Sequence, residues 1–264
     1  MSFTDLSGKI AVVTGIAGQL GPHWVEGLIS QGAKVVGLYL PGTENDDVFS
    51  KFYEKNVMLL PVDIRSKQDI EAALKKLSQQ YEVPHILVAN AGIDHPPTSQ
   101  NTFNLNTLDR DSFFKMLEVN IWGTFQTIQI FGAAMTQLRR GSIIAIGSLY
   151  SVVSPDERFY SHLNYDPPFI KHPAYGASKA AIVNCVKYFS THWAKYGVRI
   201  NALSPGGVLG AQDDEFIKKF SERVPMGRLA NSSEVVSSML FLASDASSYI
   251  TGINLCVDGG YTAW

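Results

Sequence analysis

Hydrophobic and polar residues follow two different patterns along the chain. Short, continuously apolar runs recur from end to end, and most are followed by a longer segment with apolar residues three or four positions apart. Such runs predict strands buried on both faces, and the longer segments predict amphipathic helices. Strands are expected at Ile10–Val13, Lys34–Leu40, Val57–Val62, Ile86–Ala89, Ser142–Ile146, Arg199–Leu203 and Ile253–Val257.

The amphipathic segments predict helices between these strands. Helices are expected at Gly21–Gln31, Lys67–Gln80, Arg110–Leu138 (one long helix or a close pair) and Ala174–Tyr196. Strands that alternate with helices predict a doubly wound, Rossmann-type α/β fold, here with seven parallel strands and helices on both faces. No repeat or linker divides the chain, so residues 1–264 are expected to form one dinucleotide-binding catalytic domain.

Composition narrows the class of protein. A chain of 264 residues that is 45% hydrophobic and 17% charged can bury a sizeable core. A net charge of -2 without a basic run argues against nucleic-acid binding. No apolar run approaches the roughly 18 residues that a membrane span requires, and no leader pattern is present. Cys185 and Cys256 show no metal-ligand spacing, so we expect two buried thiols, no metal site and a cytoplasmic location.

A glycine-rich turn follows the first predicted strand. Gly15, Gly18 and Gly21 lie in Thr14–Gly21, immediately before the first predicted helix. Glycines allow close approach of a pyrophosphate, which the helix N-terminus then binds with its free N–H groups. The order of strand, turn, helix and strand favours dinucleotide binding over a purely structural turn.

The end of the second predicted strand bears on the choice of dinucleotide. An acidic residue there commonly binds the ribose hydroxyls of NAD, but this strand ends in Tyr39 and Leu40. No Lys or Arg follows to hold a 2′-phosphate, and Glu44, Asp46 and Asp47 would repel one. The sequence therefore favours NAD over NADP as cofactor.

Tyr175 and Lys179 form the strongest catalytic candidate. Residues four apart lie on the same face of a helix, so the ammonium group is expected beside the phenol. A nearby cation favours the phenolate and is expected to lower the tyrosine pKa. Such a pair also occurs by chance on solvated helices, so it needs support from the rest of the chain.

That support comes from motifs spread over nearly the whole sequence. Together, in this order and at these spacings, they resemble the short-chain dehydrogenase/reductase family, and more narrowly its oxidoreductases of flagellin-glycan and nonulosonic-sugar pathways. The motifs are Thr14–Gly21, Asp63-Ile64, Asn90-Ala91-Gly92, Asn120, Ser148, Tyr175 with Lys179, Ser204-Pro205-Gly206-Gly207 and Ser247–Gly252 with Asp258-Gly259-Gly260.

The resemblance implies a catalytic role for four residues. Tyr175 would exchange a proton with a substrate alcohol while hydride passes between the same carbon and nicotinamide. Lys179 would lower the tyrosine pKa and hold the nicotinamide ribose, and Ser148 would donate a hydrogen bond to the substrate oxygen. Asn120 would hold a water that relays protons to Lys179. The alternative for Asn120 is a local irregularity of the predicted long helix.

The resemblance also implies the dinucleotide contacts. The glycines and Leu20 would lie at the diphosphate, Asn90 and Ala91 at the adenosine ribose, and Pro205 at the nicotinamide. Asp63 would accept a hydrogen bond from the adenine amino group, or would instead serve as a helix N-cap. The full implied set is Gly15, Gly18, Gln19, Leu20, Gly21, Tyr39, Asp63, Ile64, Asn90, Ala91, Gly92, Tyr175, Lys179, Pro205, Gly206 and Val208.

Three departures from the family pattern stand out. Gln19 occupies a position that is usually glycine, and Gly210 stands where a threonine is usual. Ser148 and Tyr175 are 175 − 148 = 27 positions apart, about twice the usual gap, so residues 150–173 form an inserted loop. Its aromatic, proline and polar residues suit a sugar-like substrate, although the loop could instead pack on a neighbouring subunit.

Two further segments are interpreted from the resemblance. Residues 207–224 would form a flexible lid over the substrate. The aromatic tail, with Tyr261 and Trp264, would help to build a homotetramer or a homodimer. Two other functions stay open: a nucleotide-sugar epimerase or dehydratase, and a dinucleotide-sensing protein without turnover.

Overall fold

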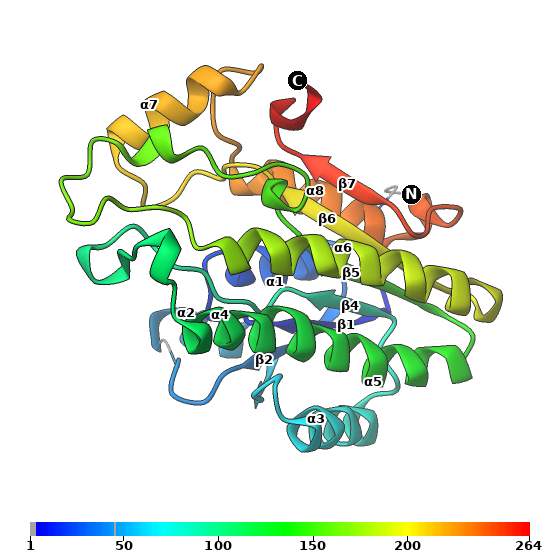
Figure 1. Ribbon diagram of the computed structural model, residues 1–264. Helices are drawn as coiled ribbons and strands as arrows, with labels where there is room; N and C mark the ends of the chain where they lie inside the picture. Colours follow the sequence, from blue (N-terminus) through cyan, green and yellow to red (C-terminus); the bar gives the residue numbers. More distant parts are fainter. Residues whose placement is uncertain (1–3, 45) are drawn as a thin grey trace.

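Seven parallel strands form one sheet in the order β3-β2-β1-β4-β5-β6-β7 (Figure 1). The structure is a computed structural model that describes residues 4–44 and 46–264. The parallel pairing and the helical connections confirm the predicted Rossmann-type fold. The strands are β1 (Ile10–Thr14), β2 (Lys34–Tyr39), β3 (Met58–Pro61), β4 (Ile86–Ala89), β5 (Gly141–Ile146), β6 (Val198–Pro205) and β7 (Asn254–Val257).

Helices cover both faces of this sheet. Buried side chains of α1, α2 and α8 share one core cluster, whereas those of α3, α5 and α6 share the other. The helices are α1 (Gly21–Ser30), α2 (Asp46–Glu54), α3 (Lys67–Gln80), α4 (Arg110–Leu117), α5 (Thr124–Gln137), α6 (Pro173–Trp193), α7 (Asp214–Arg223) and α8 (Ser232–Ala243).

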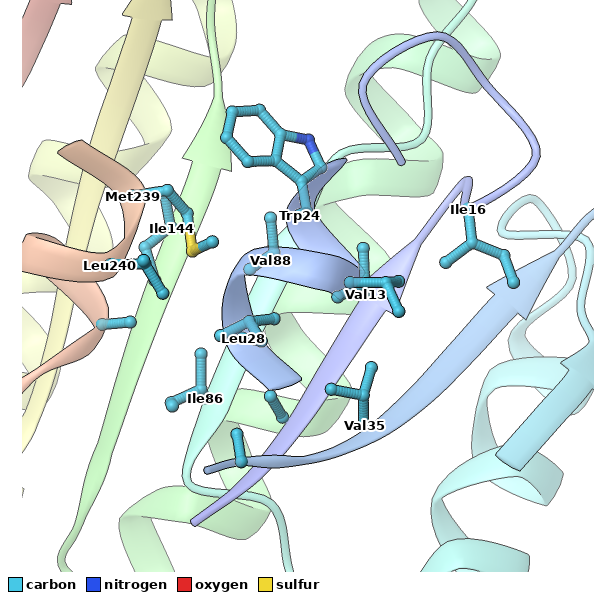
Figure 2. Close-up of a cluster of buried hydrophobic side chains, with 14 of the residues drawn as sticks. Val13, Ile16, Trp24, Leu28, Val35, Ile86, Val88, Ile144, Met239 and Leu240 are labelled. Carbon is cyan, nitrogen blue, oxygen red and sulfur yellow. The ribbon is translucent and has the colours of Figure 1, made fainter. Parts of the chain in front are cut away.

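The two cores follow from the alternation of side chains along each strand. Ala11 and Val13 of β1 point into one core, and Val12 between them points into the other. Figure 2 shows the first core, where Trp24 of α1 and Met239 of α8 approach the sheet. Because β1 and β4 are buried on both faces, their sequences are largely apolar, which is why these strands were predictable.

The segment predicted at Arg110–Leu138 as one long helix or a close pair is a close pair, α4 and α5, joined by a π-helical turn at Glu118–Gly123. Helices α2, α7 and α8 were not predicted. Helix α7 lies within the segment that was interpreted as a flexible lid.

The sheet order positions a binding crevice. Strand β1 pairs with β2 on one side and with β4 on the other. Strands β2 and β3 therefore extend the sheet in one direction from β1, and β4 to β7 extend it in the opposite direction. Ligands bind beyond the carboxyl ends of the strands at such a reversal. Within the described residues, no helix combines the length and apolar character needed to cross a membrane.

Candidate active site

A cavity of about 670 Å³ lies at this edge of the sheet. Residues that follow β1, β2, β3, β4, β5 and β6 line it, together with part of the inserted loop and α7. Most of the predicted site residues are among them: Gly15, Gly18, Gln19, Leu20, Asp63, Ile64, Asn90, Ala91, Gly92, Ser148, Tyr175, Lys179, Pro205, Gly206 and Val208. Asn120, Gly21 and Tyr39 do not line the cavity.

The glycine turn approaches the loop after β4 very closely. Gly15 has a positive φ of 68°, and a Cβ atom there would lie 2.8 Å from the Cα atom of Ala91. A Cβ atom at Gly21 would lie 2.5 Å from the Cα atom of Ile16, so Gly21 closes the turn rather than facing the cavity. Helix α1 begins at Gly21 and has no acidic residue in its first turn. Its positive dipole end therefore remains available to an anion.

Hydrogen bonds from Asn90 stabilise this glycine turn. Its side-chain amide donates to the carbonyl oxygens of Thr14 and Gly15 at 3.0 and 3.1 Å. Its Oδ1 accepts a hydrogen bond from the indole of Trp24 at 2.8 Å. The hydroxyl of Thr14 accepts from the backbone N–H groups of Asn90 and Ala91. Trp24 was not predicted to contribute, and Thr14 was predicted only as part of the glycine-turn motif, because their partners are distant in the chain.

One end of the cavity lies at β2 and β3, where the adenosine was expected. Asp63 forms an ion pair with Arg65 at 2.6 Å, and the hydrogen bond from Arg65 lowers the pKa of Asp63. Asp63 is not the N-cap of α3, since Ser66 accepts the capping hydrogen bond from the N–H of Asp69. Arg65 lines the cavity and was not predicted.

Tyr39 does not occupy the position that the sequence suggested. Its ring packs edge-on against Phe49 of α2, with 4.9 Å between the ring centroids. Leu38 and Leu40, its neighbours in sequence, line the cavity instead. Successive side chains of a strand point to opposite faces of the sheet, so Leu38 and Leu40 face the cavity while Tyr39 between them faces away from it.

Tyr175, Lys179 and Ser148 come together at the wall of the cavity. Tyr175 lies in the first turn of α6, one turn before Lys179, and it is hydrogen-bonded to Ser148. The ammonium nitrogen of Lys179 lies 5.8 Å from the centre of the Tyr175 ring and donates to the carbonyl oxygen of Ile146 at 2.9 Å. The two elements β5 and α6 therefore position the three side chains.

Burial governs the ionisation of these groups. It raises the pKa of Tyr175 above its ordinary value, with the hydrogen bond to Ser148 opposing the change. The predicted lowering of this pKa is therefore wrong, because burial and the negative charge of nearby Asp94 both disfavour the phenolate. Burial also lowers the pKa of Lys179 to about 8.

Asn120 lies behind the cavity in the π-helical turn. Its side chain exchanges two hydrogen bonds with the backbone of Ile93, at 2.8 and 2.9 Å. It also donates to the hydroxyl of Ser178 at 3.1 Å. The helix is thus irregular at Asn120, and the side chain ties α4 and α5 to the loop after β4 and to α6. Its predicted role in a proton relay stays a prediction.

The inserted loop reaches the cavity. Tyr150, Tyr160 and Lys171 of this loop line the cavity beside Tyr175. The loop also packs on α7, where His162 pairs with Asp213 at 2.9 Å. Of these residues only Tyr175 was predicted individually.

Gln19 and Gly210, the two residues that depart from the family pattern, lie next to each other in the structure. A Cβ atom at Gly210 would lie 2.5 Å from the side-chain nitrogen of Gln19. The glycine at 210 therefore leaves room for the glutamine at 19. Gly206 is similarly close to the C-terminal segment, since a Cβ atom there would lie 2.7 Å from the Cα atom of Asp258.

Within residues 4–44 and 46–264, no three His, Cys, Asp or Glu side chains gather closely enough to hold a metal ion. His172 instead serves as the N-cap of α6, accepting from the N–H of Ala174 at 3.2 Å.

Comparisons with known proteins agree with this geometry. The family model described as short chain dehydrogenase matches residues 9–219. An NAD-dependent glycerol dehydrogenase of Listeria innocua serovar 6a is 34% identical over 98% of this chain and 95% of its own length. A galactitol 2-dehydrogenase (L-tagatose-forming) of Cereibacter sphaeroides is 29% identical over 98% of this chain and 97% of its own.

Solved structures show the same fold. A short chain dehydrogenase from Leptospira borgpetersenii with bound NAD+ superimposes with a TM-score of 0.85 and 30% identity, covering 99% of this chain and 96% of that one. A gluconate 5-dehydrogenase from Burkholderia cenocepacia in complex with NADP and tartrate gives a TM-score of 0.85 and 26% identity, covering 99% and 98%. The narrower resemblance to flagellin-glycan oxidoreductases stays a prediction. The chain belongs to the short-chain dehydrogenase family and is an NAD(P)-dependent dehydrogenase that acts on CH–OH groups.

Proposed function

We propose that this protein interconverts a secondary alcohol and a ketone on a polyol or a similar sugar-like substrate. The observation that carries the proposal is the placement of Tyr175, Lys179 and Ser148 at one cavity wall, between the glycine turn and the inserted loop. Glycerol and galactitol dehydrogenases among the relatives support a polyhydroxylated substrate.

The residues present fit a nicotinamide dinucleotide. Gly15 and Gly206 allow the backbone after β1 and after β6 to pack closely on Ala91 and Asp258, and α1 directs its N-terminus toward the glycine turn. Leu20, Asn90 and Val208 extend the surface along which such an elongated ligand would be held. When bound, the nicotinamide ring accepts or returns the hydride.

The protein residues would manage the proton and the substrate oxygen. Burial keeps the phenol of Tyr175 protonated at neutral pH, so it can donate this proton to a carbonyl oxygen during reduction. During oxidation the phenol must first lose its proton to solvent before it can accept the proton of the alcohol. Ser148 would donate a hydrogen bond to the same oxygen and stabilise its developing charge. Lys179 is held beside Tyr175 by Ile146 and would contact the nicotinamide ribose.

Replacing Tyr175 by phenylalanine tests this function. The change removes only the hydroxyl group, so we expect kcat for polyol oxidation to fall by at least about 100-fold, the usual contribution of general acid–base catalysis. Dinucleotide affinity should stay within about threefold of the wild type. Absorbance of the reduced nicotinamide gives the rate, and unchanged turnover by Tyr175→Phe would refute the assignment.

We further propose that NAD is preferred over NADP. At the β2 end the cavity is lined by Leu38, Leu40 and Thr43, and the charge of Arg65 is compensated by Asp63. A 2′-phosphate would have to compete with Asp63 for its cation. Fluorescence titration of the purified protein should therefore show at least about tenfold tighter binding of NAD+, a difference of about 1.4 kcal/mol. Tighter binding of NADP+ would contradict the preference.

We also propose that the protein assembles as a homotetramer, or as a homodimer if only one of two interfaces forms. Exposed aromatic residues on α6 and on the π-helical turn, and the exposed Trp264 of the tail, support this proposal.

A further inference from the structure

An ion pair outside the predicted catalytic set lies next to Tyr175. Lys171, near the end of the inserted loop, pairs with Asp94, which follows β4. Both residues line the cavity, and their side chains are 9% and 37% exposed respectively. The ammonium nitrogen of Lys171 lies 5.3 Å from the centre of the Tyr175 ring, closer than that of Lys179 at 5.8 Å.

The carboxylate of Asp94 and the ammonium group of Lys171 can each form further hydrogen bonds besides the one between them. One oxygen of Asp94 accepts from Lys171 and the other from the backbone N–H of His95 at 2.8 Å. A carboxylate offers about four lone-pair sites, and an ammonium group has three N–H donors. An acceptor and a donor therefore remain side by side at the cavity wall, where a substrate hydroxyl could use both.

The charges of the pair favour an uncharged ligand. Asp94 compensates Lys171, so a substrate carboxylate at this place would gain little from the ammonium and would be repelled by the carboxylate. A hydroxyl group has no such penalty, and it is both a donor and an acceptor. The rings of Tyr150 and Tyr160 line the cavity nearby and suit the apolar C–H face of a carbon chain.

We propose that Asp94 and Lys171 form a subsite for the hydroxyl group adjacent to the reacting carbon, and that this subsite selects uncharged polyols over sugar acids. The inference rests on the proposed function and specifies its substrate class. The inserted loop supplies Lys171, so the subsite gives this loop a direct role in specificity.

Steady-state kinetics of Asp94→Asn and Lys171→Met test the subsite. The substrates are galactitol and D-arabinitol as polyols, 2-butanol as an alcohol without a neighbouring hydroxyl, and gluconate as a sugar acid. We expect KM for the polyols to rise at least about tenfold in both variants, whereas KM for 2-butanol should not change. Besides burial, Asp94 raises the pKa of Tyr175, so any change of kcat in Asp94→Asn should be the same for galactitol and 2-butanol.

For the sugar acid, the Asp94→Asn change should have the opposite effect and improve the use of the substrate. Asp94→Asn leaves Lys171 without its carboxylate partner, so kcat/KM for gluconate relative to galactitol should rise at least about tenfold. Lys187→Gln is the control, since it removes an exposed lysine of α6 that does not line the cavity and leaves the pair intact. It should leave the polyol KM unchanged. A wild type that prefers gluconate, or equal effects on 2-butanol and galactitol, would overturn the subsite.

Failure of the proposed function would look different. If the wild type oxidises none of these alcohols, the proposed function is wrong. The subsite is then decided by calorimetric titration of galactitol into the protein with NAD+ bound. At least about tenfold weaker binding to Asp94→Asn and Lys171→Met would support the subsite, and equal affinity, or no binding by the wild type, would overturn it.

Discussion

Lys179 carries an ammonium group that the fold has removed from water. Burial lowers its pKa from 10.5 to about 8, so a substantial fraction of the group is neutral at mildly alkaline pH. The same burial raises the pKa of Tyr175. Sequence spacing correctly indicated that these side chains are neighbours, but it could not weigh desolvation against charge attraction, because burial depends on the whole fold.

The lowered pKa of Lys179 predicts a pH-dependent stability difference. Between about pH 8 and 10.5 the unfolded chain holds a proton at Lys179 that the folded chain has lost, so raising the pH stabilises the fold. Relative to Lys179→Met, the wild type should therefore gain up to about 3 kcal/mol of unfolding free energy over this interval. Urea unfolding at several pH values measures the gain.

A lysine on the surface of the same helix provides the control for this measurement. Lys187 of α6 is exposed, so Lys187→Met should follow the wild type at every pH. A constant difference between the wild type and Lys179→Met from pH 7 to 10.5 would show that Lys179 is not desolvated as the structure indicates.

At the scale of elements, the glycine turn shows how local sequence and distant contacts combine. The strand, the turn and the start of α1 were predictable from nearby residues. The close approach of Gly15 to Ala91 was not, because the two residues are brought together by the pairing of β1 with β4. The π-helical turn around Asn120 was expected only as the alternative role of that residue, a local irregularity, since an apolar pattern with helical spacing does not reveal one extra residue in a turn.

Alanine substitutions at Gly8 and Gly15 distinguish the cost of a positive φ angle from the cost of a steric clash. Gly8 and Gly15 both have positive φ, but a Cβ atom at Gly8 would meet nothing within 4 Å. Gly8→Ala should therefore cost only about 1 kcal/mol of unfolding free energy, whereas Gly15→Ala should cost at least about 2 kcal/mol more. Gly15→Ala should also weaken NAD+ binding at least about tenfold. Chemical denaturation and fluorescence titration check both effects, and equal losses for the two variants would contradict the steric argument.

At the scale of the whole molecule, exposed aromatic residues bear on assembly. Tyr261 was expected to help build an oligomer, but it is 1% exposed and stacks on Phe220 of α7 within the same chain. It therefore gives no support to a tetramer. Trp264 is 74% exposed, and Trp122 in the π-helical turn is 51% exposed. Trp122 stacks on Phe125 of α5.

A glutamate at position 122 tests the proposed assembly. A charge in an apolar interface is costly to desolvate, so Trp122→Glu should shift the protein to a smaller species at micromolar concentration. Light scattering coupled to gel filtration measures the mass. Tyr53→Glu on α2 is the control, since Tyr53 is similarly exposed but belongs to another surface. An unchanged mass for Trp122→Glu would remove this surface from the proposal.

The sequence by itself determined the positions of the strands along the chain and most of the helices, because buried strands are largely apolar and amphipathic helices carry apolar residues every three to four positions. The order of the strands in the sheet came only from the structure. Motif spacing likewise indicated the family and the pairing of Tyr175 with Lys179. Only the tertiary structure decided that Tyr39 faces Phe49, that burial raises the pKa of Tyr175, and that Asp94 pairs with Lys171. Those features arise where distant segments meet, and there desolvation and contact distance depend on the folded chain as a whole.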